Sequence, residues 1–349
     1  MTVTLHDVAS AAGVSIKTVS NVVRGQGNFS ESTRIRVEAA VERLGYRPNL
    51  AARGLRSGRL GVIGLVVPDI RNPYFAELAD AVMRASAEHD LLVVIEQSDG
   101  DRDTELELLR GRGTRMVDGI LFSVFGLSSG AEGLAESVTK PVVVLGEPVP
   151  GWPTDFVSMH HREGVRAATA QLIQEGRRRI AVLGARRDEQ VGSARLRLAG
   201  YSDALGDAGM AIAAELVVDI DLWTRAQGAA AVRGLLDAGV DFDAVVAFND
   251  ALALGAIRAL EDQGLKIPDD VAVVGFDDIE EARYSAPSLS TVRPAVQDLA
   301  QTAVRFLLER IESDADVEPP RGHRAACTLE LRESTGPAAS ADAISTALA

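Results

Sequence analysis

The chain opens with three short runs in which apolar residues recur every three or four positions, the period of an amphipathic helix. The apolar positions are Leu5, Val8, Ala9 and Ala12, then Val19, Val22 and Val23, then Ile35, Val37, Val41 and Leu44. Gly13 permits a sharp turn between the first two runs. Ser15 and a Thr4–Asp7 capping box mark two helix starts. The pattern predicts a helix-turn-helix closed by a third helix over 30–44.

The second of these helices leaves a partly polar face, formed by Ile16, Lys17 and Asn21, that points outward. Residues 1–58 hold eight Lys or Arg and four acidic residues, a net charge of +4, whereas the whole chain carries −14. A basic head on an acidic body is expected where only one end of the chain contacts the phosphates of a nucleic acid. A helix face of the kind formed by Ile16, Lys17 and Asn21 can read base edges in the DNA major groove. The alternative is a three-helix bundle whose basic surface serves protein contacts.

Residues 47–59 form the junction between this head and the rest of the chain. Pro48 ends the segment that belongs to the head, and Asn49 is a suitable N-cap for a helix that runs to about Ser57. A helix of about nine residues that contains Gly54 is marginal in water, so it forms only when something holds it. The sequence therefore predicts a hinge helix, with a plain flexible linker as the alternative that its apolar residues disfavour.

Beyond residue 60 the pattern changes to short apolar runs that alternate with helical patterns. The apolar runs are 61–67, 91–95, 120–122, 142–145, 180–183, 244–248 and 271–276. The helical patterns include 73–88, 163–174, 196–207, 225–237 and 251–263. This alternation predicts parallel sheets covered by helices on both faces. Because a body of about 275 residues exceeds one comfortable core, we expect two lobes.

Polar residues follow several of the predicted strands. Asp69, Asn249 and Asp277 each come just after an apolar run, and Arg197 lies near the start of a predicted helix. Open α/β sheets bind ligands at the carboxyl ends of their strands, and two facing lobes form a cleft there. A guanidinium, an amide and carboxylates together supply the donors and acceptors that hold hydroxyl groups.

Two aromatic residues complete the candidate ligand site, and several of its members also have a purely structural interpretation. Trp223 and Phe75 are able to present flat faces to a sugar or base ring. Asn249, like its neighbour Asp250, is equally suited to capping the helix that follows it. A tryptophan in a loop, such as Trp223, is as often a residue that packs against the core. Tyr74 and Phe75, just inside a predicted helix, could likewise belong to the core.

Several motifs occur in one order along nearly the whole chain, from Val3 to about Glu333. After the helix-turn-helix and the hinge they are VDG at 117–119, SARLRLAG at 193–200, FND at 248–250 and VGFDD at 274–278. In these motifs the chain resembles the lactose/galactose repressor family of bacterial transcription regulators. The resemblance implies a two-lobed body like a type-I periplasmic binding protein.

The resemblance also implies contact residues. The residues expected to contact DNA are Thr4, Ser15, Ile16, Lys17, Thr18, Ser20, Asn21, Asn28, Ala52 and Leu55. Among them, Leu55 matches the hinge leucine that wedges into the minor groove, and Ala52 matches a neighbouring minor-groove contact. For the ligand, the resemblance implies contacts from Arg197, Trp223, Asn249 and Asp277. Asp69 and Phe75 complete the expected ligand contacts on the grounds of position and residue type given above.

The expected organisation has four parts. An all-α head spans 1–46, a hinge 47–59, and a two-lobed α/β body 60–333, with lobe crossings near 159, 292 and 323. The Ala/Ser-rich tail, 334–349, is expected to be disordered.

Two departures from the family pattern leave the identity of the ligand open. His160 and His161 stand where the family usually has an Asp-Asn pair. Gly146, followed by Glu147, stands where an aspartate usually follows the strand over 142–145.

Other features exclude whole classes of function. The single Cys327 fits a reducing cytoplasm, and no signal peptide or membrane-length apolar run is present. We therefore expect a cytoplasmic protein with no membrane association. The chain lacks nucleophile, dinucleotide and phosphate-loop motifs, and its histidines lack metal-ligand spacing. No enzyme activity, cofactor or metal is expected.

These observations predict a sequence-specific DNA-binding transcriptional regulator, favoured as a repressor, which binds a pseudo-palindromic operator as a homodimer. A small polar ligand between the lobes, a sugar or sugar derivative, is expected to control its operator affinity. One alternative is a corepressor-dependent repressor, or an activator, that responds to a nucleoside or purine-like ligand. A more remote alternative is a solute-binding module.

Overall fold

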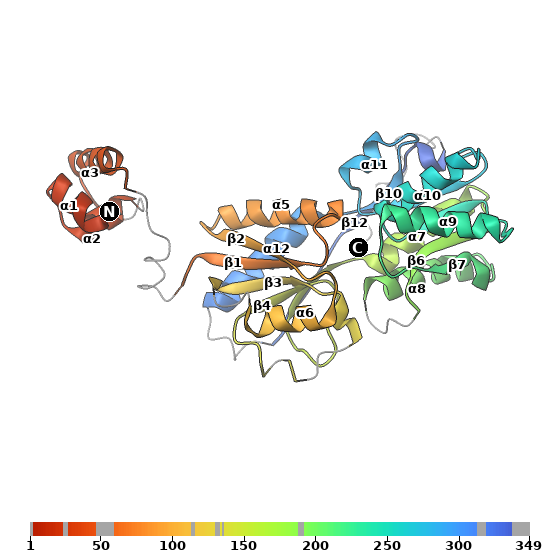
Figure 1. Cartoon of the computed structure of the whole chain (residues 1–349), viewed down its shortest axis with the longest axis horizontal. Helices are drawn as coiled ribbons and strands as arrows, with labels where there is room; N and C mark the ends of the chain where they lie inside the picture. Colours follow the sequence, from red (N-terminus) through yellow and green to blue (C-terminus); the bar gives the residue numbers. More distant parts are fainter. Residues whose placement is uncertain are drawn as a thin grey trace. The chain divides into compact units, whose positions relative to one another are not determined.

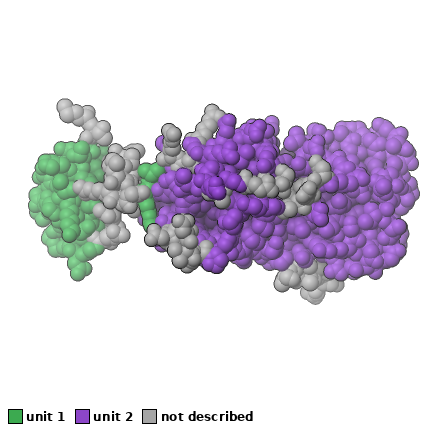
Figure 2. All heavy atoms as spheres, turned by 90° about the horizontal axis from the view of Figure 1, so that it is seen from below, with its two compact units in different colours: residues 1–60 green, residues 61–349 purple. Residues whose placement is uncertain are grey.

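The computed structural model describes residues 3–23, 27–46, 59–112, 116–129, 133–134, 136–187, 192–312 and 319–336. The chain divides into two compact units, residues 1–60 and 61–349, which Figure 2 shows in different colours. The predicted hinge helix, including Ala52 and Leu55, lies outside the described residues.

The head contains the three predicted helices, α1 (Leu5–Ala12), α2 (Ile16–Val23) and α3 (Glu31–Leu44). Thr4 N donates to Asp7 Oδ2 at 2.8 Å, and Thr4 Oγ1 accepts from Asp7 N, which completes the predicted capping box. Gly13 ends α1 with a φ of +64°, a left-handed conformation that favours glycine. Ser15 Oγ accepts from Thr18 N at 3.0 Å and so caps α2.

The core of the head differs from the prediction at two apolar positions. Val8, Val19 and Val37 are fully buried at its centre, but Val23 and Ile35 are exposed. Ile35 precedes Val37 by two residues, which is about 200° around a helix with 3.6 residues per turn, so it faces the opposite side.

The body contains two six-stranded sheets (Figure 1). The first has the order β11-β5-β4-β3-β1-β2, and all its neighbouring pairs are parallel. Its strands are β1 (Val62–Val67), β2 (Leu92–Gln97), β3 (Gly119–Ser123), β4 (Val142–Leu145), β5 (Asp155–Met159) and β11 (Gly322–Ala325).

The second sheet has the order β12-β10-β9-β8-β6-β7. Its strands are β6 (Ile180–Ala185), β7 (Val217–Asp219), β8 (Ala244–Ala247), β9 (Ala272–Phe276), β10 (Ser290–Pro294) and β12 (Cys327–Glu330). The prediction of parallel sheets is wrong for β12, which is antiparallel to β10. The carboxyl ends of the other strands in both sheets point toward the space between the lobes. A chain that runs straight from β11 into β12 therefore enters the second sheet against its direction.

Helices cover both faces of each sheet, which confirms the predicted α/β architecture (Figure 1). In the first lobe α5 (Pro73–Ala87) and α12 (Val296–Glu312) cover one face, and α6 (Arg102–Glu107) with η1 (Leu108–Arg112) covers the other. In the second lobe α7 (His161–Gln174) and α8 (Ser193–Asp207) cover one face, and α9 (Arg225–Asp237) and α10 (Asp250–Asp262) the other. The short elements are α11 (Glu280–Tyr284), η3 (Gly126–Ser129), η4 (Ala214–Leu216) and η5 (Glu333–Thr335).

The chain passes between the two lobes three times, at residues 160, 295 and 326. The second and third crossings lie three residues beyond the expected positions, because β10 continues to Pro294 and β11 to Ala325. Five strands, β5, β7, β10, β11 and β12, were not among the predicted apolar runs.

The expectation of a disordered tail from residue 334 onward is wrong for residues 334–336. Ser334 and Thr335 are buried, and Ser334 Oγ accepts from Ser290 N at 2.8 Å and donates to Val273 O at 2.6 Å. These bonds attach η5 to the second sheet, and residues 337–349 lie outside the described part. Among the described residues, no helix combines the length and the apolar character needed to span a membrane.

Candidate functional site

The head offers a polar surface at the start of α1 and along α2. Lys17 is exposed on α2, and Asn28 is exposed after it. Asn21 is half-buried, and Ile16 packs partly against the core of the head. Ser20, which we expected at the DNA, is buried on the inner side of α2.

Two of the expected DNA-contact residues, Thr4 and Ser15, already serve as caps, and Thr18 bonds to the second of them. Thr4 belongs to the capping box of α1, and Ser15 Oγ lies 2.8 Å from Thr18 Oγ1 at the start of α2. These caps mark two helix N-termini with free backbone N–H groups, and Lys17 lies in the first turn of the second helix, α2. Helix N-termini of this kind bind phosphate groups.

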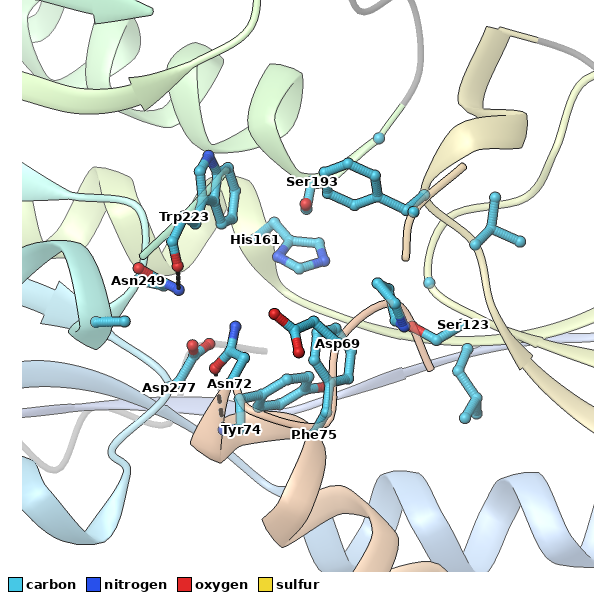
Figure 3. A pocket seen from close by; sticks show the side chains of 18 of the residues that line it. Asp69, Asn72, Tyr74, Phe75, Ser123, His161, Ser193, Trp223, Asn249 and Asp277 are labelled. Carbon is cyan, nitrogen blue, oxygen red and sulfur yellow. Dashed lines mark hydrogen bonds between the residues drawn. The ribbon is translucent and has the colours of Figure 1, made fainter. Parts of the chain in front are cut away.

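In the body, a cavity of about 650 Å³ lies between the lobes at the carboxyl ends of the strands. All six residues expected to contact a ligand line it. Figure 3 labels five of them, Asp69, Phe75, Trp223, Asn249 and Asp277. Asp69 and Phe75 come from the first lobe. Asp69 lies in the loop after β1, and Phe75 lies at the start of α5. Arg197, Trp223, Asn249 and Asp277 come from the second lobe. Because residues from both lobes face one cavity, a ligand bound there bridges the lobes.

A buried guanidinium occupies the second-lobe wall of this cleft. Arg197 Nε donates to His161 Nδ1 at 3.2 Å, and Nη1 donates to Phe248 O. Its Cζ lies 3.7 Å from the centre of the Phe276 ring, and its Nη2 lies 3.8 Å from Asp277 Oδ1. The last distance exceeds that of a hydrogen bond, so Nη2 and Asp277 keep donor and acceptor capacity for a ligand.

The carboxylate of Asp277 is held in an unusual environment. The residue has a φ of +121°, which is rare for any residue other than glycine, and only 6% of it is exposed. Burial raises the pKa of Asp277 well above its ordinary value, while the positive charge of Arg197 acts in the opposite direction. A strained, buried carboxylate at a cleft wall is typical of a functional site.

Asn249 has the structural role that the sequence left open, and it also lines the cleft. Its Oδ1 accepts from Leu252 N at 2.8 Å and caps α10. Its Nδ2 donates to Trp223 O at 3.2 Å, and the Trp223 ring lies edge-on to Phe248 at 5.9 Å. Asn249 therefore fixes the loop that carries Trp223 into the cleft (Figure 3).

On the first lobe, Asp69 projects into the cleft (Figure 3). Its carboxylate accepts from Arg71 Nε at 2.9 Å and from Arg71 Nη2 at 3.0 Å. Phe75 packs edge-on against Tyr74 with 5.1 Å between ring centres. This aromatic pair packs against the core and also lines the cleft, so the ligand contact of Phe75 stays a prediction.

Further residues line the cleft that the sequence did not identify as ligand contacts. They are, among others, Asn72, Tyr74, Ser123, Phe125, His161, Arg186 and Ser193. Ser123 ends β3 and Ser193 begins α8, so their positions at element ends were a usable signal. His161 was noticed only as a departure from the family pattern. Glu147, in the other departure, accepts from Ser158 Oγ and pairs with Arg324 at 2.9 Å.

Most charged side chains of the cleft already have a partner of opposite charge. Arg71 pairs with Asp69, Arg197 with Asp277, and Arg225 with Glu281 at 2.8 Å. This balance suits a neutral polar ligand. No group of three or more metal-ligating side chains occurs in the part of the chain that the structure describes.

Comparisons with known proteins agree with this architecture. The family described as bacterial regulatory proteins, lacI family, matches residues 4–49, and a periplasmic binding protein-like domain matches residues 169–335. Catabolite control protein A from Priestia megaterium is 33% identical over 341 residues, which cover 96% of this chain and 100% of that protein.

Two solved structures are similar over nearly the whole chain. The complex of the transcriptional regulator CelR with cellobiose has a TM-score of 0.69 and 32% identity, covering 95% of this chain and 99% of that one. The Lac repressor dimer bound to operator and the anti-inducer ONPF has a TM-score of 0.78 and 26% identity, covering 97% and 100%.

These similarities confirm the resemblance that the sequence motifs predicted, from the helix-turn-helix to the end of the second lobe. The relatives are transcriptional regulators. The chain therefore belongs to the lacI family of bacterial regulatory proteins, and it is a DNA-binding transcriptional regulator.

Proposed function

We propose that the protein is a repressor whose operator affinity is controlled by a neutral polyhydroxy ligand, a sugar or sugar derivative, bound between the lobes. The observation that carries this proposal is the cleft, in which Arg197, Asp277 and Asp69 supply hydrogen-bonding groups from both lobes. The complex of the similar regulator CelR with cellobiose supports the ligand class. No catalytic role is proposed, and a regulator of this kind acts in the cytoplasm, where operator DNA is found.

The control acts through the relative angle of the lobes. A ligand that binds one lobe arrangement more tightly shifts the equilibrium toward it, and the shift is limited by that difference in affinity. The predicted hinge, residues 47–59, contains a helix that is only marginally stable by itself. We propose that this helix folds only when two heads are held on the operator. We favour an inducer, which separates the hinges, over a corepressor.

The proposed function is tested by a thermal-shift screen of the full chain. The panel holds cellobiose, lactose, maltose, sucrose, D-glucose, D-galactose, adenosine and guanosine. A ligand at 100 times its Kd stabilises the folded state by about 2.7 kcal/mol, so the bound sugar raises Tm. The same sugar should weaken the mobility-shifted complex with a palindromic operator selected from a random library. A shift with nucleosides alone would favour the alternative effector, and no shift with any member would contradict the sugar proposal.

We also propose that the operator-binding form is a homodimer, and the edge of the first sheet provides a surface for it. The edge strand β2 leaves Leu92, Val94 and Ile95 exposed by 51, 44 and 39%. An apolar edge strand with unpaired backbone groups is normally covered by a partner. The Lac repressor, to which the chain is similar, is a dimer in its operator complex, so the occupant we propose is a second copy of this chain.

Val94→Asp should convert the dimer to a monomer, because it places a charge in the centre of this apolar edge. Sedimentation velocity measures the change, and operator affinity should fall at least about tenfold because one head reads too few base pairs. Ile212→Asp is the matched control, since Ile212 is 47% exposed but lies in the second lobe. A Val94→Asp protein that sediments as a dimer would rule out this edge as the interface.

Two substitutions on α2 should separate phosphate from base recognition. Lys17→Ala should weaken binding to every DNA sequence and reduce the slope of log affinity against log salt by about one. Asn21→Ala should cost about 1–3 kcal/mol on the selected operator and little on unrelated DNA, because an amide pairs with adenine through two hydrogen bonds. Lys266→Ala, an exposed lysine of the body, serves as the control. Equal losses on both DNAs for Asn21→Ala would contradict a base-reading role.

A further inference from the structure

We propose that His161 is a specificity-determining residue of the cleft: a neutral imidazole that directs its Nε2–H toward the effector and requires a hydrogen-bond acceptor there. This inference rests on the proposed function, because it assumes that the effector occupies the cleft. It concerns a position at which this chain departs from its family's usual residue.

The hydrogen bond from Arg197 determines which nitrogen of the imidazole carries the proton. A guanidinium only donates hydrogen bonds, and Arg197 Nε lies 3.2 Å from His161 Nδ1. Nδ1 must therefore accept, and the proton of the neutral ring lies on Nε2. The Arg197 side chain is itself fixed by Phe248 O and by its stacking on Phe276, so it cannot easily release the imidazole.

The surroundings of His161 keep the ring uncharged. Burial and the adjacent Arg197 charge both lower the pKa of His161 well below its usual value. His161 is also the first residue of the 14-residue helix α7, where the positive end of the helix dipole disfavours a cation. The ring packs at 5.9 Å from the Phe276 ring, which limits its rotation.

The second nitrogen is left for a ligand. His161 lines the cleft, and Figure 3 shows its ring between Trp223, Ser193 and Asp69. No described residue forms a hydrogen bond with its Nε2. The neighbouring His160 behaves differently, because its Nδ1 lies 3.5 Å from Glu163 and it does not line the cleft.

A neutral imidazole of this tautomer offers the ligand one donor and no acceptor. An amide at the same place offers both, and a carboxylate offers only acceptors. The effector atom that faces His161 must therefore be a hydrogen-bond acceptor, which in a neutral sugar is a hydroxyl, ring or carbonyl oxygen. An ammonium group, as in a protonated amino sugar, would meet only the hydrogen of Nε2–H at this point.

Two substitutions test this assignment, because each retains one nitrogen position of the imidazole. The amide of His161→Gln reaches the place of Nε2 and keeps a donor for the ligand. The amide of His161→Asn reaches only the place of Nδ1, so it keeps an acceptor for Arg197 but loses the donor. His160→Asn is the matched control outside the cleft.

The binding probe is the neutral sugar of the panel above that raises the Tm of the wild type most. We expect its Kd to rise at least tenfold in His161→Asn and less than threefold in His161→Gln and His160→Asn. Without sugar, His161→Gln should nevertheless have a lower Tm than His161→Asn, because Arg197 Nε loses its hydrogen-bond acceptor in His161→Gln. Equal affinities in His161→Asn and His161→Gln would overturn the proposal.

A measurement without sugar separates this proposal from the function it rests on. Long-range ¹H–¹⁵N spectra of the ¹⁵N-histidine-labelled full chain, assigned by the signals that His161→Asn removes, report the tautomer directly. We expect an Nε2–H ring that stays neutral from pH 8 to pH 5. An Nδ1–H tautomer, or a ring charged at pH 7, would overturn the proposal. If no sugar bound the wild type, the sugar proposal would fail, and these spectra would still decide whether His161 is the donor.

Discussion

An Arg197→Ala protein is expected to keep its operator affinity, to lose every response to the effector, and to unfold more easily. Arg197 contributes to the cleft wall through its fork of donors, and 4% of it is exposed. Its removal takes away the partner of Asp277, whose carboxylate is buried, and the hydrogen bond to Phe248 O. Breaking a buried ion pair by removing one member costs about 3–5 kcal/mol.

Urea unfolding followed by tryptophan fluorescence measures the loss of stability, and the mobility shift measures the response to the effector. Arg195→Ala is the matched control, because Arg195 lies two residues away on α8 and is exposed. Arg197→Lys retains the charge but not the fork, so it should fold and still lose most of the response. A full response in both Arg197 variants would show that the effector binds elsewhere.

The parts of the fold that local sequence controls were predictable. The three helices of the head and the caps of the first were predicted correctly, because Thr4, Asp7 and Gly13 act on backbone groups within a few residues of themselves. The central strands of both sheets were visible as apolar runs, since they are covered on both faces. Ile35 shows the limit of predicting burial from residue type alone. We expected this apolar residue to face inward, but its position around the helix places it on the exposed side.

The missed strands depend on contacts that are distant in sequence. β11, with the sequence GHRA, and β12, with CTLE, have no apolar run, and both lie at sheet edges. Gly322 is paired with Phe156 across 166 positions of the chain, so nothing near β11 indicates its partner. The antiparallel direction of β12 follows from the third lobe crossing, which is a property of the whole topology.

The candidate site was partly predictable for a related reason. Asp69, Asn249 and Asp277 follow buried parallel strands, whose carboxyl ends gather at one edge, so their meeting in the cleft could be expected. His161 follows β5, which has a polar first residue and was not predicted. Its role depends on a guanidinium 36 positions away, and no local pattern contains that information.

The largest effect on stability away from the cleft is expected at Asp155, the first residue of β5. Its side chain is completely buried and accepts from Arg310 Nη2 at 2.7 Å and from Arg321 Nη2 at 2.8 Å. It also accepts from the backbone N of Arg321 at 2.8 Å. One carboxylate thus joins β5, α12 and the segment that leads into β11. These are the three elements of the first lobe that adjoin the crossings.

Asp155→Asn should lower the free energy of unfolding by about 3 kcal/mol, because it removes the buried carboxylate that two guanidinium groups, 11 and 29% exposed, share. Burial raises the pKa of Asp155, but the hydrogen bonds from Arg310 and Arg321 outweigh it, and the net pKa is lowered. A carboxyl whose pKa is lower in the folded state stabilises the protein above its unfolded pKa of about 3.9, and this contribution disappears as pH falls through the folded value.

Urea unfolding of the wild type and of Asp155→Asn between pH 7 and pH 2.5 therefore measures how much the ion pairs of Asp155 contribute to the free energy of unfolding. The difference in stability should be full at pH 7 and should shrink below about pH 4, as the wild-type carboxyl takes up its proton. Asp203→Asn breaks a surface pair with Arg162 and should cost less than about 1 kcal/mol at every pH. If the two substitutions had the same small effect, the ion pairs of Asp155 would not stabilise the first lobe. Nearly all of its stability would then come from the apolar core that α5 and α12 form with the sheet.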